Sequence, residues 1–180
     1  MPRPAIFFDR DGVINVSPGE GYVLSWEAFQ FNPGIMETTK LCRELGYALV
    51  LVTSQQGVGK GLMSQGTLDD IHASMQRELA AQGAAFDQIE ACTHLSGTCT
   101  CRKPSPEMIY TAAAALDLDL SCSWLIGDHD RDIQMAMNAG VPNTIRVLSD
   151  HEPGVAATHT IASTAELPAL LRVVLARAVP

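Results

Sequence analysis

Two patterns of apolar residues alternate along this chain. Short runs of consecutive apolar residues are typical of strands buried on both faces, and apolar residues spaced three or four apart are typical of helices packed on a sheet. Their alternation predicts an α/β fold with a doubly wound parallel sheet. We expect strands at 5–8, 48–52, 86–91, 123–126, 144–148 and 159–161, and helices at 33–45, 64–82, 106–116, 130–140 and 164–177.

Two segments interrupt this alternation. Residues 12–31 are broken by a proline and glycines, and a connection this long in a compact domain is usually functional, so we expect a lid over a site. Asn32 and Pro33 then have the residue types of a helix cap and a first helical position. Residues 55–61, Gln-Gln-Gly-Val-Gly-Lys-Gly, match neither the P-loop nor the dinucleotide-binding fingerprint. They predict a mobile loop with one cation, Lys60.

Composition excludes several classes of function. The 180 residues contain 12 Lys and Arg against 20 Asp and Glu, and the net charge of −8 opposes binding to nucleic acid. No apolar run approaches the roughly 20 residues that a membrane-spanning helix needs. The amino terminus, Met1-Pro2-Arg3, does not resemble a signal peptide. We therefore expect a single domain over residues 1–180 that is cytoplasmic and monomeric, with no nucleic-acid or membrane partner.

Carboxylates follow two of the predicted strands. Asp9 and Asp11 end the first strand, and an extended backbone would point both side chains to the same side. Asp128 follows the fourth strand, with Asp132 four residues further on. Because parallel strands share one carboxyl edge, we expect these residues to form one site, with oxygen ligands that suit Mg²⁺. Asp132 could brace the ligands from outside or simply favour a helix amino terminus.

The same edge offers groups for phosphate chemistry. Thr53 ends the second strand and Lys103 lies in the loop after the third, so a hydroxyl and an ammonium are available for phosphate oxygens. A carboxylate can be the nucleophile of phosphoryl transfer through an aspartyl-phosphate. A second carboxylate two residues later can protonate the leaving oxygen and then activate water. These residues favour a phosphatase that acts on a small phosphorylated metabolite.

A second cluster combines three cysteines and a histidine within ten residues. Cys92, His94, Cys99 and Cys101 match a closed, tetrahedral Cys₃His zinc site, and the alternative is a loop of free, reduced cysteines. Such a zinc ion would be structural and would order the loop that leads to Lys103. The two remaining cysteines, at positions 42 and 122, we expect to be buried apolar residues.

Four motifs resemble, in order, those of the haloacid-dehalogenase (HAD) superfamily of phosphatases. The resemblance implies a Rossmann-like core without a large cap domain. It also implies that Asp9 is the nucleophile and that Asp11 is the general acid and base. Magnesium would be held by Asp9, Asp128 and the backbone carbonyl of Asp11, and phosphate by Thr53 and Lys103. The motifs are Asp9-Arg10-Asp11-Gly12, Thr53, Arg102-Lys103-Pro104 and Gly127-Asp128-x-x-x-Asp132.

The loop that contains the cysteines makes this resemblance more specific, because it is similar to one subgroup of the superfamily. Cys-x-His followed by Cys-x-Cys-Arg-Lys-Pro resembles the subgroup that contains heptose 1,7-bisphosphate phosphatases and histidinol phosphatases. The sequence around Lys60 is closer to the heptose enzymes, whereas the short gap between His94 and Cys99 is closer to the histidinol enzymes. Lys60 and Arg102 are accordingly expected to contact substrate. Ser54 replaces the asparagine that both groups usually carry, so its substrate contact stays open.

Two other classes use some of the same residues. A response-regulator receiver also has an acidic pair, a threonine and a lysine, but its acceptor aspartate follows a middle strand, whereas Asp9 follows the first. A zinc-knuckle nucleic-acid module would use only the cysteine cluster, and the net charge of −8 opposes it. We therefore expect a heptose bisphosphate as substrate and treat histidinol phosphate as the alternative.

Overall fold

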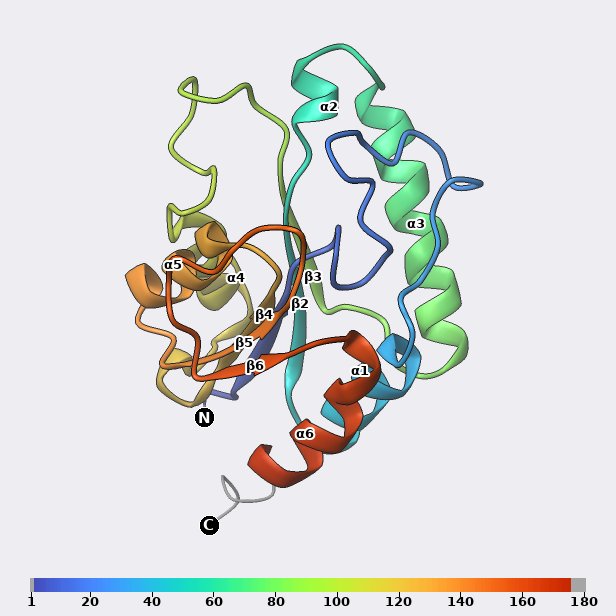
Figure 1. The fold of residues 1–180 in the computed structure, drawn as a ribbon. Helices are drawn as coiled ribbons and strands as arrows, with labels where there is room; N and C mark the ends of the chain where they lie inside the picture. Colours follow the sequence, from blue (N-terminus) through green and yellow to red (C-terminus); the bar gives the residue numbers. More distant parts are fainter. Residues whose placement is uncertain (1, 176–180) are drawn as a thin grey trace.

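The computed structural model describes residues 2–175. Six parallel strands form one sheet in the order β3-β2-β1-β4-β5-β6 (Figure 1). The expected doubly wound parallel sheet is therefore confirmed. The strands are β1 (Ala5–Phe8), β2 (Ala48–Ser54), β3 (Gln88–Cys92), β4 (Trp124–Gly127), β5 (Asn143–Val147) and β6 (His159–Ile161).

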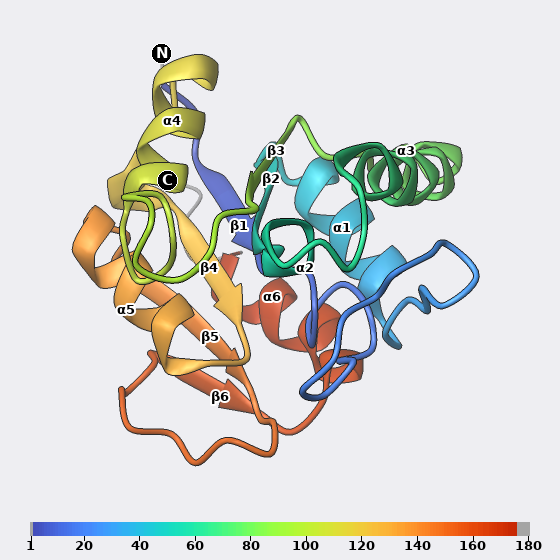
Figure 2. The same ribbon diagram turned by 90° about the horizontal axis from the view of Figure 1, so that it is seen from above.

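Helices cover both faces of the sheet (Figures 1 and 2). The helices α1 (Ile35–Glu44), α3 (Gln65–Ala81) and α6 (Leu167–Leu175) pack on one face, and α4 (Glu107–Leu116) and α5 (Asp130–Ala139) on the other. Short helical turns complete the fold: α2 (Gln56–Gly59), η1 (Leu120–Cys122) and η2 (Thr164–Glu166). The end of the helix expected at 164–177 lies outside the described residues. No second folded unit stands over the sheet in the described part of the chain, as expected for an enzyme without a large cap.

The first strand shows why the sequence forms this sheet. Ile6 and Phe8 pack with the helices of one face, and Ala5 and Phe7 with those of the other, because successive side chains of a strand point to opposite sides. All four side chains are fully buried. A continuous apolar run is therefore what a central strand needs when both of its faces are covered.

Pairing of the central strands sets the position of the site. Strand β1 pairs with β2 on one side and with β4 on the other, and all three run in the same direction. The backbone amide of Asp9 continues this pairing by donating to the carbonyl of Ile126 at 3.0 Å. The segments that follow β1, β2 and β4 consequently leave the sheet at one edge. In Figure 1 this edge is the upper end of the sheet, where the chain passes from β2 into the turn labelled α2.

The glycine-rich segment, for which the sequence predicts a mobile loop, contains a short helix. Residues 56–59 form the helical turn α2, and the amide of Gly59 donates to the carbonyl of Thr93 at 3.0 Å. A Cβ atom on Gly59 would lie 2.5 Å from that carbonyl oxygen, so only glycine permits this approach. A contact with a distant segment therefore orders a sequence with little helix propensity of its own.

The start of α1 also differs from the expected cap. The residue before the helix is Gly34, in a left-handed conformation, and no side chain caps the first turn. The side chain of Asn32 instead donates to the backbone carbonyls of Val13 at 3.0 Å and Asn15 at 2.9 Å. Asn32 therefore closes the connection after β1 instead of beginning the helix.

Two further features concern the long connection and the isolated cysteines. Aromatic side chains hold the connection together: Trp26 stacks on Phe29 with ring centroids 4.9 Å apart.

Of the two cysteines outside the cluster, Cys42 is buried, as expected. The same expectation was wrong for Cys122, which is exposed because it lies in a surface turn before β4. No helix between residues 2 and 175 is both long enough and apolar enough to span a membrane.

Candidate active site

A buried lysine joins two carboxylates at the sheet edge. Lys103 Nζ donates to Asp9 Oδ1 and to Asp132 Oδ1, each at 2.7 Å, and all three residues are at most 7% exposed. The other oxygen of Asp132 accepts a hydrogen bond from the backbone amide of His129 at 3.0 Å. Both oxygens of Asp132 are thus engaged at the start of α5, where an acidic side chain is also favoured by the helix dipole.

The site concentrates negative charge away from water. Burial, helped by the carboxylates of Asp132 and Asp128, raises the pKa of Asp9 from 3.8 to about 8, although Lys103 opposes the shift. Burial and Asp132 likewise raise the pKa of Asp128 to about 6. Burial alone would lower the pKa of Lys103, but the carboxylates of Asp132 and Asp9 outweigh it and raise the pKa overall. A further cation would relieve this repulsion.

The donor set suits a hard divalent ion. Carboxylate oxygens of Asp9, Asp128 and Asp132 lie within 4.8 Å of one another. Three carboxylates face a single ammonium, and oxygen donors are what Mg²⁺ prefers. The residues present therefore fit the magnesium ion that the sequence predicts. The carboxylate of Asp11 is not in this group, and the family resemblance assigns only its backbone carbonyl to the metal.

Two glycines allow the carboxylates to approach the turns. A Cβ atom on Gly12, whose φ is +88°, would lie 2.2 Å from a carboxylate oxygen of Asp128. A Cβ atom on Gly127 would lie 2.3 Å from the Cβ of Asp132. Side chains at either position would push the acidic residues apart. Packing therefore requires glycine at both positions, and at Gly12 the left-handed backbone conformation favours it as well.

Asp11 is held by side chains that surround its carboxylate. Arg10 Nε and Nη2 donate to Oδ1 at 3.3 and 3.0 Å, and Asn15 Nδ2 donates to the same oxygen at 2.9 Å. Gln55 Nε2 donates to Oδ2 at 2.9 Å and also to the hydroxyl of Thr53 at 2.8 Å. The orientation of Asp11 is consequently fixed by residues that come from two different strand ends.

A cavity of about 190 Å³ opens on this edge. Asp9, Asp11 and Lys103 line it, together with the expected substrate residues Ser54 and Arg102. A larger cavity of about 660 Å³ adjoins it and shares Asp128 in its lining. We assign the chemistry to the smaller cavity, because it is the one that contacts both Asp9 and Asp11.

Two side chains of the small cavity carry unpaired polar atoms. Ser54 Oγ and Arg102 Nη1 are buried and have no hydrogen-bond partner within residues 2–175. A buried donor without a partner is costly, so these atoms are suited to a polar ligand. The structure therefore brings Ser54 and Arg102 to the site, and their unpaired atoms fit the anion that the sequence predicts.

Thr53 and Lys60 lie differently from the other predicted residues. Thr53 is 1% exposed and is not part of the cavity lining; its hydroxyl accepts from Gln55. Lys60 is exposed, and its ammonium lies 5.3 Å from the ring centroid of Tyr22, which lines the cavity. Lys60 therefore lies at the rim, held by a cation–π contact with the connection after β1.

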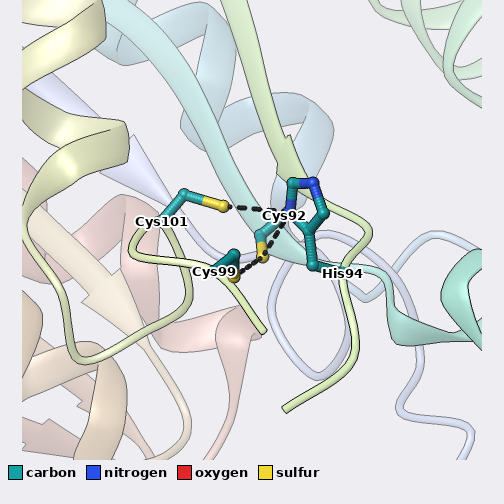
Figure 3. Close-up of side chains that lie close together, drawn as sticks. All are labelled: Cys92, His94, Cys99 and Cys101. Atoms are coloured by element: carbon teal, nitrogen blue, oxygen red, sulfur yellow. Dashed lines mark hydrogen bonds between the residues drawn. The ribbon is translucent and has the colours of Figure 1, made fainter. Parts of the chain in front are cut away.

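The four side chains of the cysteine cluster point toward one another and form a compact group (Figure 3). Cys92 Sγ lies 3.5 Å from Cys99 Sγ and 3.8 Å from His94 Nδ1. Cys101 Sγ lies 3.4 Å from the same nitrogen, and all four donor atoms are within 4.8 Å of one another. Tetrahedral zinc–sulfur bonds separate ligands by roughly 3.8 Å. The donor set and its spacing therefore fit the zinc ion that the sequence predicts.

Several site residues were missed by the sequence analysis. Arg10, fully buried, and Gln55 contact Asp11, and His72 contacts Arg10. An arginine placed between two aspartates directly after a buried strand was a signal that could have been read. His72 and Gln55 left no such signal, because their contacts depend on how α3 and β2 pack beside β1.

Comparisons with known proteins agree with this geometry. Residues 100–170 match the HAD-hydrolase-like family model. A D-glycero-beta-D-manno-heptose-1,7-bisphosphate 7-phosphatase of Yersinia pestis is 35% identical over 181 residues, which cover 94% of this chain and 95% of that relative. The enzyme of the same name from Vibrio cholerae serotype O1 is 39% identical over 155 residues, 82% of each chain. A crystal structure of D,D-heptose 1,7-bisphosphate phosphatase from B. bronchiseptica, complexed with magnesium and phosphate, has a TM-score of 0.85 at 31% identity and covers 94% of this chain and 98% of that one.

Proposed function

Because this chain belongs to the HAD-like phosphatases, in the family of the D-glycero-beta-D-manno-heptose-1,7-bisphosphate 7-phosphatases, we propose that it removes one phosphate from a heptose 1,7-bisphosphate. The observation that carries the proposal is the pair formed by Asp9 and Lys103 at 2.7 Å, with Asp11 lining the same cavity. This pair provides a nucleophile and a phosphate-binding cation side by side.

Asp9 acts as the nucleophile in this proposal. One of its oxygens attacks phosphorus, the bond to the sugar oxygen breaks, and an aspartyl-phosphate forms. Lys103 orients Asp9 and stays beside the phosphoryl group, where its positive charge stabilises the transition state. Ser54 and Arg102 offer their unpaired donors to the remaining phosphate oxygens. Thr53 accepts a hydrogen bond from Gln55, which also donates to Asp11, so Thr53 helps to hold the general acid.

Asp11 acts as general acid and then as general base. It gives a proton to the leaving sugar oxygen in the first half-reaction, and in the second it takes a proton from the water that hydrolyses the aspartyl-phosphate. Attack of that water regenerates the Asp9 carboxylate and releases inorganic phosphate. The fixed orientation of Asp11 supports this role, because proton transfer requires hydrogen-bond reach to the leaving oxygen.

Magnesium is the proposed catalytic cofactor. Asp9, Asp128 and the backbone carbonyl of Asp11 would hold it, with Asp132 bracing the site through its bonds to Lys103 and to a backbone amide. When bound, the ion offsets the repulsion between the carboxylates and stabilises negative charge on the phosphoryl group.

We propose that the protein works as a monomer in the cytoplasm.

Zinc is the proposed structural cofactor. Its ligands would be Cys92, His94, Cys99 and Cys101, which leave no open coordination position for chemistry. Arg102 and Lys103 follow directly after the last ligand in the sequence. Binding of zinc would thus order the loop that delivers two phosphate-binding side chains.

Phosphate release tests the proposal directly. We would compare D-glycero-D-manno-heptose 1,7-bisphosphate with histidinol phosphate in the presence of Mg²⁺, using Asp9→Asn as the blank. Loss of one phosphate from the bisphosphate, with a clear preference in kcat/KM, is the expected result. Preference for histidinol phosphate would reject the heptose assignment. Activity on neither compound would exclude both as substrates and keep only the general proposal of a phosphatase.

A further inference from the structure

Arg10 connects the catalytic turn to a helix that lies outside the site. Its side chain is 0% exposed, and its guanidinium donates to Asp11 through Nε and Nη2. The remaining nitrogen, Nη1, lies 3.2 Å from Nε2 of His72, a residue of α3 that is 7% exposed. The buried cation of Arg10 thus bridges the carboxylate of Asp11 and the imidazole of His72, which is 62 positions away from Arg10 along the chain.

The chemistry of the two side chains defines the direction of this contact. A guanidinium has only donors, so Arg10 must donate and His72 Nε2 must accept. An accepting Nε2 carries no proton, and the imidazole is therefore neutral. Burial and the charge of Arg10 lower the pKa of His72 to about 4, which agrees with a neutral ring at physiological pH.

We propose that His72 is a positioning residue for catalysis: it fixes Arg10, and Arg10 in turn fixes the proton-transferring carboxylate of Asp11. This inference rests on the proposed role of Asp11 as general acid and base. His72 satisfies a guanidinium donor that would otherwise be buried and unpaired. Without that acceptor, Arg10 must turn toward another partner, and the carboxylate of Asp11 loses its most extensive contact. A misplacement of about 1 Å is enough to slow proton transfer strongly.

The leaving group separates positioning from simple damage to the fold. An alkoxide leaves only if an acid protonates it, whereas p-nitrophenolate leaves without protonation. The value of kcat/KM reports the steps up to the first irreversible one, here formation of the aspartyl-phosphate. Loss of a well-placed acid must therefore lower kcat/KM for the sugar phosphate far more than for p-nitrophenyl phosphate.

The experiment compares two variants of His72 in the magnesium-loaded protein. His72→Leu removes the acceptor, and we expect kcat/KM for heptose 1,7-bisphosphate to fall by about tenfold or more, with a much smaller change for p-nitrophenyl phosphate. His72→Gln keeps an acceptor on a flexible side chain, and we expect it to restore most of the loss. Met75→Leu, a volume-conserving change at a buried position of α3, is the matched control and should change neither value.

The outcomes distinguish this inference from the function on which it rests. Asp11→Asn sets the benchmark, because it should lower the sugar phosphate value selectively by about a hundredfold. If Asp11→Asn lowers kcat/KM equally for both substrates, the acid role of Asp11 is wrong and the inference falls with it. If Asp11→Asn lowers kcat/KM selectively for the sugar phosphate but His72→Leu lowers it equally for both substrates, or for neither, the inference alone is wrong. Should His72→Leu fail to fold, His72→Phe takes its place, because a phenyl ring fills a similar volume without an acceptor. A loss of kcat/KM in that variant that is equal for the two substrates, or no loss, contradicts the inference.

Discussion

The two candidate metal sites differ in how the chain assembles them. The cysteine cluster takes all four ligands from residues 92–101, which are the last residue of β3 and the loop that follows it. The carboxylate site joins residues after β1 and β4 with a lysine from the loop before α4, and Lys103 is 94 positions from its partner Asp9. A local cluster can be recognised from spacing alone, whereas the carboxylate site exists only once the sheet has formed.

The two sites also differ in what holds them without metal. Lys103 already neutralises part of the charge of Asp9 and Asp132, so the carboxylate site carries its own counter-ion. In the cysteine cluster the donors contact one another directly: Cys92 lies against Cys99 and His94, and Cys101 lies against His94. We infer that removal of zinc lowers the stability of the cysteine loop, whereas loss of a carboxylate lowers catalytic activity.

The largest expected effect is on activity. Asp9→Asn should lower kcat for the bisphosphate by about 10⁴-fold or more, because the amide cannot form the aspartyl-phosphate. Its melting temperature should stay close to that of the native protein, since the amide has nearly the same volume and loses a repulsive charge. Steady-state kinetics and a thermal unfolding curve measure the two quantities. Substantial turnover in this variant would remove Asp9 as the nucleophile.

Loss of zinc should affect stability most. Cys99→Ser should reduce zinc content and destabilise the loop, with a loss of several kcal/mol if zinc binding is coupled to folding as in other structural sites. Cys122→Ser is the matched control, because this cysteine is exposed and contacts none of the cluster. Metal analysis together with thermal unfolding measures the effect. An unchanged unfolding curve in verified zinc-free protein would contradict a structural role.

Lys60 should contribute to the choice of substrate. Lys60→Ala removes a cation at the rim, so we expect kcat/KM for the bisphosphate to fall by up to about tenfold, an effect of roughly 1.4 kcal/mol, with little change for a sugar monophosphate. Lys40→Ala offers a comparison with an exposed lysine on α1. Equal losses on both substrates would exclude Lys60 from recognition of a second phosphate.

A final expected effect concerns the pH dependence of stability. The pKa of His72 is about 4 in the fold and 6.5 when unperturbed, so the unfolded state binds the proton first. The stability that neutral His72 provides is therefore complete above pH 6.5 and is lost as the pH falls toward 4, by at most about 1.4 kcal/mol per pH unit. His72→Gln lacks this titration. Its free energy of unfolding should approach the native value more closely at pH 5 than at pH 7.5, as chemical denaturation can measure, and a constant difference would contradict the assignment.

Much of the fold and part of the site could be predicted from local patterns. The central strands are uniformly apolar because both of their faces are covered, and the six predicted strands agree with β1–β6 within a few residues. The Cys92–Cys101 cluster and the Asp9-x-Asp11 pair were predicted for the same reason: the chemistry requires certain residue types at short spacing. The geometry of the cysteine cluster in the structure fits that prediction.

The sequence by itself determined which residues could carry chemistry, and the tertiary structure decided how they are oriented. The contacts of Arg10 with His72 and of Gln55 with Asp11, and the ordering of residues 56–59 by Thr93, could not be predicted from the sequence. Each depends on packing between segments far apart in the chain, and that packing leaves no periodic pattern in either segment. Local spacing determines the available groups, whereas sheet register and helix packing determine which of them meet.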